Sequence, residues 1–178
     1  MWNGRLAEYL ALVERTGATH IEVSNGTIPL DQAGKAGYVR RLAGVRPVLA
    51  EVGYTDAGRS ARLTPDDWAG ALAQDLDAGA WMVITEARES GRSGIARADG
   101  HVRADVLSAV LAAIDPAAIM FEAPAKDLQV EMIRAVGPGV NLGNVAAADV
   151  IGVATPRRGL RSDTLLDLAS PLLAPTAA

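Results

Sequence analysis

The chain contains no cysteine, and only 4% of its 178 residues are aromatic. The lack of cysteine excludes disulfides and thiolate metal ligands, and it fits a cytoplasmic protein. With so few aromatic side chains, the core must be built from Ala, Val, Leu and Ile. That composition suits parallel strands whose two faces are both covered, as in α/β proteins.

Long apolar stretches and an excess of positive charge are also missing. No segment is long enough to span a membrane, so we expect a soluble protein without a membrane partner. A net charge of −4 and the absence of a basic stripe argue against nucleic-acid binding. No Gly-x-Gly-x-x-Gly or phosphate-loop motif follows a predicted strand, which argues against a dinucleotide or nucleoside triphosphate site.

Apolar segments of strand length alternate with helical patterns along the chain. The predicted strands cover residues 19–25, 45–52, 81–86, 119–122 and 140–142. The predicted helices cover residues 6–16, 32–42, 65–77, 103–114, 126–136, 147–153 and 164–173, followed by a frayed tail at 174–178. Repetition of strand, helix and strand is typical of βαβ units. We therefore predict one α/β domain over residues 1–178, with a parallel sheet.

Four glutamates lie within or at the end of otherwise apolar predicted strands: Glu22, Glu51, Glu86 and Glu122. A buried carboxylate is costly unless it is paired or coordinates a metal. The C-terminal strand ends of a parallel barrel converge on one face, so these acids, with Asn141 and Asn144, would suit Mg²⁺. The alternative is that each glutamate pairs with an arginine or caps a helix.

Basic residues follow some of the same strand ends. They are Arg88, Lys126, Arg157, Arg158 and Arg161. The arginine fork matches phosphate oxygens, and a phosphate site after the last strands recurs in parallel barrels. This pattern predicts binding of a small anionic substrate, whereas a solvated basic turn is the other interpretation of the arginines near the C-terminus.

Seven short segments contain most of these polar residues: 21–26, 51–53, 75–80, 86–91, 121–126, 140–144 and 158–164. In their order and spacing they resemble the phosphosulfolactate synthase family over nearly the whole chain. That family has a (β/α)₈ barrel of the TIM type. The resemblance therefore implies an incomplete barrel that holds the last five βα units, with about 75 to 95 residues of the barrel lacking a counterpart before Met1.

The resemblance implies a Mg²⁺-dependent lyase that adds sulfite to phosphoenolpyruvate, giving (2R)-phospho-3-sulfolactate on a route to coenzyme M. Sulfite would attack the terminal carbon of the enol phosphate, and a general acid would protonate the adjacent carbon. The expected metal ligands are Glu22, Glu51, Glu86 and Glu122. The expected substrate-binding residues are Ser24, Arg88, Asn141, Asn144, Arg158 and Arg161.

One departure from the family concerns the general acid. The family generally has a lysine shortly after the Glu-Val-Gly strand, whereas this chain has Tyr54, Thr55 and Asp56. Tyr54 and Lys126 are therefore the candidate catalytic residues.

Two other functions stay open at this point. The first is a non-catalytic relative, either stress-related like some plant members or a partner-binding protein, and association with another copy of the chain is a related expectation. The second is an aldolase that acts on a phosphorylated keto acid. An aldolase would need a Schiff-base lysine at a strand end, and no predicted strand contains a lysine.

Overall fold

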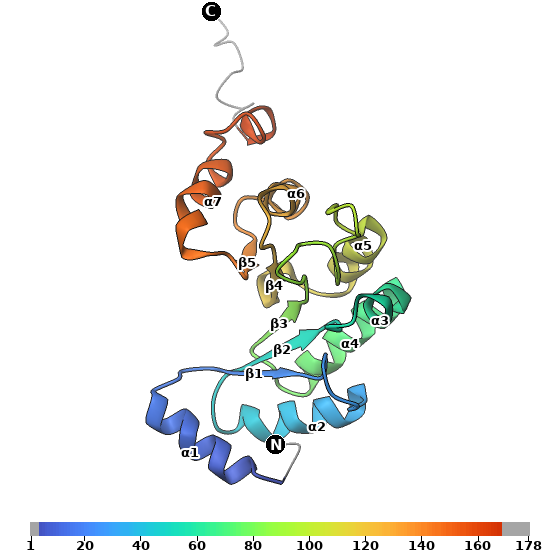
Figure 1. Ribbon diagram of the computed structural model, residues 1–178, viewed down its shortest axis with the longest axis vertical. Helices are drawn as coiled ribbons and strands as arrows, with labels where there is room; N and C mark the ends of the chain where they lie inside the picture. The colour runs from blue at the N-terminus through green and yellow to red at the C-terminus, as the bar shows by residue number, and fades with distance from the viewer. Residues whose placement is uncertain (1–3, 169–178) are drawn as a thin grey trace, which may run out of the picture.

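The computed structural model describes residues 4–168, and a five-stranded sheet lies at its centre. The strands are β1 (Ile21–Ser24), β2 (Val48–Val52), β3 (Met82–Thr85), β4 (Ile119–Glu122) and β5 (Asn141–Gly143). They lie in chain order, and each neighbouring pair is parallel. Figure 1 shows them following one another from β1 in the lower half to β5 in the upper half. The predicted α/β class with a parallel sheet is confirmed.

Helices precede, connect and follow the strands. They are α1 (Leu6–Thr16), α2 (Gln32–Ala43), α3 (Ala57–Arg62), α4 (Pro65–Asp77), α5 (Ala104–Ala113), α6 (Lys126–Val136) and α7 (Val150–Arg157), with 3₁₀ turns η1 (Pro116–Ala118) and η2 (Ala147–Asp149). A parallel sheet in chain order, with a helix in each crossover, is the arrangement of consecutive units in a TIM-type barrel. The structure therefore agrees with a partial barrel of this type.

Local sequence signals set the ends of the helices where they were expected. At the start of α4, the Thr64 hydroxyl accepts a hydrogen bond from the Asp67 amide at 3.1 Å. The Asp67 carboxylate in turn accepts one from the Thr64 amide at 2.8 Å, which completes a capping box. Helix α1 ends at Gly17, whose φ of +68° is the left-handed conformation that glycine adopts most easily.

The structure contains one helix that was not predicted, and several elements begin or end at other residues than expected. Helix α3 was not predicted, although the Asp56 carboxylate caps it by accepting the Arg59 amide at 2.7 Å. Strand β2 begins at Val48 instead of residue 45, after Pro47, which has no amide to donate to a ladder. Helix α7 continues to Arg157, four residues beyond the predicted end. The predicted helix over 164–173 is helical at 165–168, and its remainder and the predicted tail at 174–178 lie outside the described residues.

Side chains alternate between two faces of the sheet. One face packs against α2 and α4 and is apolar apart from the buried Thr85, with Ile21, Val23 and Val83 among its residues. We call the other side the open face; it carries Glu22, Ser24, Leu49, Glu51, Met82, Ile84, Met120, Glu122 and Asn141. The charged residues of the sheet therefore share the face that is turned away from the helix layer.

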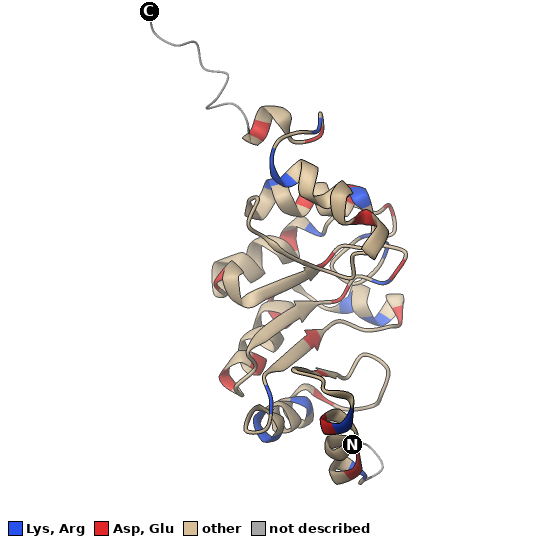
Figure 2. Ribbon diagram, turned by 90° about the vertical axis from the view of Figure 1, so that its left-hand side faces the viewer, with Lys and Arg blue, Asp and Glu red and all other residues tan. Residues whose placement is uncertain are grey.

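Acidic positions gather where the strands end. Figure 2 shows red positions at and just beyond the arrowheads of the strands, so the carboxylates lie at the C-terminal edge of the sheet. In parallel barrels this edge is where active sites are built. None of the helices within residues 4–168 has the length and apolar character needed to cross a membrane.

Candidate functional site

Three carboxylates meet at the C-terminal edge of the sheet. Glu51 lies near the end of β2, Glu86 directly follows β3, and Glu122 ends β4. One carboxylate oxygen from each lies within 4.8 Å of the other two. The Glu51 and Glu86 residues are only 8% and 7% exposed, and Glu122 is half-buried. We call these three residues the carboxylate cluster.

Strand register sets the relative heights of the four glutamates on the sheet. Thr85 lies opposite Phe121, so the next residues, Glu86 and Glu122, are at the same height on neighbouring strands. Glu22 lies opposite Leu49, two residues before Glu51 along β2. Glu51 in turn lies opposite Ile84, two residues before Glu86. Glu22 is therefore the lowest of the four on the open face; it is exposed and does not join the carboxylate cluster.

Two glycines allow the backbone to approach Glu86 closely from either side. Gly53 follows β2 with a φ of +131°, and a Cβ atom at that position would lie 2.4 Å from the Cβ of Glu86. On the other side, Gly94 has a φ of +73°, and its Cβ would lie 1.9 Å from the Glu86 carbonyl oxygen. Only glycine fits both positions, so the chain on either side of Glu86 is built around it.

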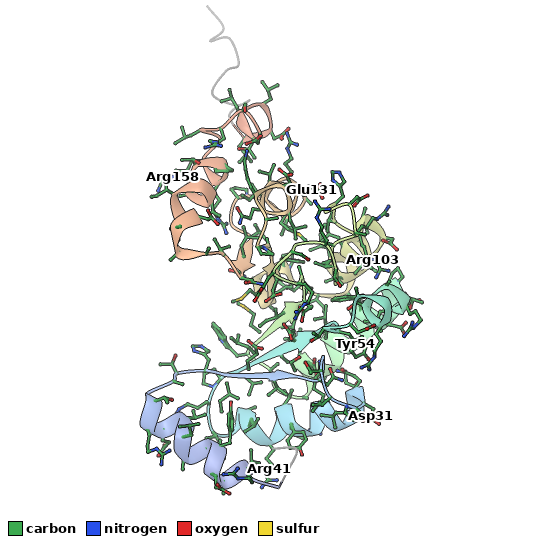
Figure 3. All side chains as sticks on the ribbon, in the orientation of Figure 1. Asp31, Arg41, Tyr54, Arg103, Glu131 and Arg158 are labelled. Atoms are coloured by element: carbon green, nitrogen blue, oxygen red, sulfur yellow. The ribbon has the colours of Figure 1, made fainter. Side chains whose placement is uncertain are left out.

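The loop between β3 and α5 is fastened to its surroundings at several points. Its Ile95 amide donates to the Glu86 carbonyl at 2.8 Å. Glu131 of α6 accepts the Val102 amide at 2.8 Å and also pairs with His101. Arg103 donates to the Leu63 carbonyl at 3.0 Å. Figure 3 labels Glu131 on α6 and Arg103 at the end of this loop, directly before α5. The loop that follows Glu86 is thus held by both α6 and the segment before α4.

The carboxylate cluster carries negative charge that no cationic side chain among the described residues neutralises by contact. No lysine or arginine within residues 4–168 forms a salt bridge with any of its three members. Burial, and then the neighbouring charges of Glu51 and Glu122, raise the pKa of Glu86 to about 7. Burial also raises the pKa of Glu122, against the effect of the Ala87 amide that donates to it at 2.9 Å.

The pKa of Glu22, the glutamate outside the carboxylate cluster, is also raised. Although Glu22 is exposed to solvent on one side, partial desolvation by the sheet raises its pKa, and the charge of Glu51 adds to that effect. The only ligand atoms that these residues offer are carboxylate oxygens, and their charges repel. Such a set fits a hard divalent cation such as Mg²⁺, which takes oxygen ligands and would relieve the repulsion.

Two of the expected anion-binding residues lie beside the carboxylate cluster. Arg88 is exposed two residues after Glu86, and its charge lowers the pKa of Glu86 in opposition to burial. Asn144 has a φ of +54° and hydrogen-bonds to Glu122, which favours the ionised form of that carboxyl. Asn144 also lines a cavity of about 360 Å³ together with Glu89 and Pro124.

Three further basic residues lie along α6, α7 and the segment after them. Lys126 is the first residue of α6, and its Nζ lies 2.8 Å from the Asp163 carboxylate. The charge of Arg161 also acts on Asp163 and lowers its pKa, after the larger effect of Lys126. Arg158 is exposed at the end of α7, as its label in Figure 3 shows. Lys126 and Arg161 are therefore near one another, while Arg158 extends from the neighbouring helix.

Ser24 and Asn141 make local contacts. The Ser24 hydroxyl accepts the Gly26 amide at 3.1 Å, and Ser24 lies opposite Glu51 on the open face. The Asn141 carboxamide donates to the Ile119 carbonyl at 3.1 Å, at the beginning of β4. Asn141 is therefore engaged at the edge of the sheet opposite to the carboxylate cluster.

Tyr54 follows Gly53 and faces the helix layer. Its ring lies under the Arg59 guanidinium, whose Cζ is 3.9 Å from the ring centroid, and its amide donates to the Ser60 hydroxyl at 2.8 Å. Tyr54 lines a cavity of about 330 Å³ whose other walls include Asn25, Gln32, Leu63, Asp67, Gly70 and Gln74. Figure 3 shows it near the end of β2. The described structure does not group Tyr54 with Lys126.

A buried ion pair beneath β2 was not anticipated from the sequence. Lys35 of α2 and Asp75 of α4 both have side chains that are 0% exposed, and their charged atoms lie 2.7 Å apart. Burial lowers the pKa of Lys35 and raises that of Asp75, while their mutual attraction opposes both shifts. The signal was present in the helical spacing, because Lys35 precedes Val39 by four residues on the core-facing side of α2.

The chain is similar to known proteins over most of its length. The family model described as (2R)-phospho-3-sulfolactate synthase (ComA) matches residues 1–163. A phosphosulfolactate synthase of Bacillus subtilis (strain 168) is 43% identical over 149 residues, which are 83% of this chain and 59% of that protein.

Two archaeal proteins with the same name are also similar. The one from Methanothermobacter thermautotrophicus is 38% identical over 165 residues, 92% of this chain and 64% of its own length. The one from Methanocaldococcus jannaschii is 37% identical over 163 residues, 90% of this chain and 65% of its own length. The chain thus spans about three fifths of the length of these relatives, and it belongs to the (2R)-phospho-3-sulfolactate synthase (ComA) family.

Proposed function

We propose that the chain acts as a phosphosulfolactate synthase, a lyase that adds sulfite to phosphoenolpyruvate with Mg²⁺ and gives (2R)-phospho-3-sulfolactate. The observation that carries the proposal is the carboxylate cluster, in which three carboxylates without a contacting cation lie within 4.8 Å at the C-terminal edge of the sheet. Membership of the family supports the reaction type. The activity and the substrates of the longer relatives come to this chain only as part of this proposal.

Glu51, Glu86 and Glu122 are the proposed ligands of the cation. A Mg²⁺ ion held there would act as a Lewis acid toward the substrate carboxylate, which takes up negative charge during the addition. Glu22 lies on the same face but lower, and we propose that it contributes its charge to the field instead of a ligand oxygen. The three carboxylates also fix where the carboxylate end of the substrate must lie.

The basic residues that follow the strands are the proposed partners of the remaining anionic groups. Arg88 follows Glu86 by two residues, and Lys126 follows Glu122 by four. Arg158 and Arg161 add two guanidinium groups, which suit tetrahedral phosphate and sulfite oxygens. Asn144, next to Glu122, offers a neutral donor. Ser24 and Asn141 stay sequence-based predictions, since their described contacts are with backbone groups.

The addition requires one new bond and one proton. The lone pair on the sulfur of sulfite forms a bond to the terminal carbon of phosphoenolpyruvate, and the electron pair of the double bond moves to the adjacent carbon. That carbon then takes a proton and keeps its phosphate, so no group leaves. We propose the Lys126 ammonium as the proton donor because it begins α6 beside the strand end, and the Tyr54 hydroxyl as the second candidate.

A second candidate function is a non-catalytic relative that binds cation and anion without turnover. One observation favours it: Tyr54 stands where the family resemblance expects a lysine shortly after the Glu-Val-Gly strand, and its ring is packed under Arg59. If neither Tyr54 nor Lys126 can deliver the proton, the basic residues and the carboxylate cluster would still bind the substrates. Binding without product would distinguish this function from the lyase.

The test is an assay of the 178-residue chain with phosphoenolpyruvate and sulfite, with and without Mg²⁺, in which ³¹P NMR follows the product. The lyase should form phosphosulfolactate only with Mg²⁺, and Glu86→Gln and Glu122→Gln should each lower the rate at least about 100-fold. Glu14→Gln, an exposed acid on α1, is the matched control and should keep full activity. Substrate binding without any product would favour the non-catalytic relative, and product formation that ignores both substitutions would contradict the proposed site.

A further inference from the structure

Lys35 reaches from the helix layer to the strand that carries Glu51. Its ammonium lies 2.7 Å from the Asp75 carboxylate and donates to the backbone carbonyl of Glu51, also at 2.7 Å. The Gln32 carboxamide completes the arrangement by donating to the other Asp75 oxygen at 2.9 Å and to the Ala71 carbonyl at 3.0 Å. Residues from α2, α4 and β2 therefore meet in one buried polar network.

The position of the carbonyl is the informative part of this network. Ser24 is the last residue of β1, and it lies opposite Glu51, so the β1–β2 ladder ends at this pair. The Lys35 ammonium bonds to the Glu51 carbonyl at the point where the ladder stops. The side chain of Glu51 belongs to the open face and to the carboxylate cluster. One residue is thus held through its backbone from the helix layer and contributes its side chain to the opposite face.

We infer that Lys35 and Asp75 form a positioning pair for the Glu51 side of the carboxylate cluster, an inference that rests on the proposed cation-binding function. Without the ammonium, the end of β2 would lose a buried charge-assisted hydrogen bond, and Glu51 would gain freedom to move away from Glu86. Repulsion among the carboxylates favours that movement whenever no cation is bound. The pair therefore holds like charges at a distance that one cation can bridge.

A purely structural role for the pair is the competing explanation, and single substitutions cannot exclude it. Removal of one partner leaves the other charge buried and unpaired, which destabilises the whole fold. Replacement of both charges by apolar side chains of similar volume often leaves stability nearly unchanged. The double variant Lys35→Met with Asp75→Leu therefore removes the bond to Glu51 while it preserves the packing between α2 and α4.

The experiment compares the affinity of the full chain for Mn²⁺, which also takes oxygen ligands and is measured directly by electron paramagnetic resonance. The double variant should bind Mn²⁺ at least about 10-fold more weakly than the unaltered chain, by analogy with outer-shell groups of metal sites. The control is Val13→Ala, which creates a cavity under α1. Val13→Ala should lower the melting temperature but keep the Mn²⁺ affinity within twofold.

Amide hydrogen exchange of residues 51–53 gives a second reading that needs no metal. The double variant should exchange these amides at least about 10-fold faster than the unaltered chain, whereas Val13→Ala should not. An unchanged Mn²⁺ affinity together with unchanged exchange would overturn the positioning role. If the unaltered chain binds no Mn²⁺, the proposed function fails, and the exchange rates alone then decide whether Lys35 and Asp75 hold the end of β2.

Discussion

The two sides of strand β2 hold buried charge in opposite ways. On the helix side, Lys35 and Asp75 are both 0% exposed and neutralise one another at 2.7 Å. On the open face, Glu51 and Glu86 are also nearly inaccessible, yet they lie beside Glu122 with charges of the same sign. The distance between the two arrangements is only the thickness of one strand, because Lys35 bonds to the backbone of Glu51 itself.

The difference separates charge that is neutralised within the chain from charge that, in the proposed function, a cation would neutralise. A buried ion pair is complete within the chain, so nothing from outside is needed to satisfy it. A group of like charges at the edge of a sheet lowers stability, and a sequence that keeps such a group departs from the rules that favour folding. Departures of this kind are typical of functional sites, and a divalent cation is the component that we propose for this one.

The largest effect that the comparison predicts is on the helix side. Lys35→Met should lower the free energy of unfolding by about 3–5 kcal/mol, because it leaves the Asp75 carboxylate buried without its partner. For a chain of this size that corresponds to a fall in melting temperature of about 10 °C, measured by circular dichroism. Addition of Asp75→Leu to the same chain should restore most of the loss. A single variant as stable as the unaltered chain would show that the pair does not carry buried charge.

On the open face, loss of one charge should have the opposite sign. Glu86→Gln removes a carboxylate that its neighbours repel, so in the absence of metal it should raise the free energy of unfolding by about 1 kcal/mol above neutral pH. The same variant should lose the stabilisation that Mg²⁺ gives to the unaltered chain, since Mg²⁺ stabilises only what it binds. Denaturation in urea with and without Mg²⁺ measures both effects. Destabilisation of the metal-free chain by Glu86→Gln would contradict the account of repulsion.

The pH dependence of stability should report on the charge of the open face. The pKa of Glu86 is raised from an ordinary 4.5 to about 7 in the folded chain. Between these values the folded chain keeps a proton that the unfolded chain has released, so the contribution of Glu86 to stability falls as the pH rises from 4.5 to about 7. Urea denaturation of the metal-free chain across this interval should show the fall. Glu86→Gln should remove this part of the pH dependence, and a rise in stability that the substitution abolishes would contradict the assignment.

The smallest predicted effect concerns Arg88. Its exposed guanidinium lowers the pKa of Glu86 across solvent, so Arg88→Ala should move the midpoint of that titration upward by only a fraction of a pH unit. Carbon-detected NMR of the Glu86 carboxyl measures the change. High salt should reduce the difference between the two proteins, whereas a downward shift would contradict the arrangement.

Most of the fold could be predicted because its signals are local. Apolar segments of strand length, which alternate with helical patterns along the chain, identified the strands. The capping box at Thr64 and the glycine at position 17 marked helix ends that the structure confirms. Helix α3 was missed because its sequence, Ala57–Arg62, has no apolar periodicity and depends on the Asp56 cap. The start of β2 was misplaced because Val45 is apolar but precedes Pro47.

The candidate site could be predicted only as a set of residues at strand ends. Spacing along the chain placed the glutamates on neighbouring strands, but the relative height of those strands depends on the register of their hydrogen bonds. Register is a property of pairing between distant segments, so no local pattern shows that Glu22 lies two residues below Glu51, or that Glu51 lies two residues below Glu86. Lys35 and Asp75 were overlooked for a similar reason, since each charge looks unfavourable on its own helix and is satisfied only by the other.

The central claim is that the carboxylate cluster binds a divalent cation, and calorimetric titration of Mg²⁺ into the metal-free chain tests it most directly. The account predicts saturable binding of about one ion per chain near neutral pH, with proton release because Glu86 must ionise. The double variant Glu86→Gln with Glu122→Gln should abolish this binding, while Glu14→Gln should leave it intact. Absence of saturable binding to the unaltered chain, or equal binding to the double variant, would contradict the account.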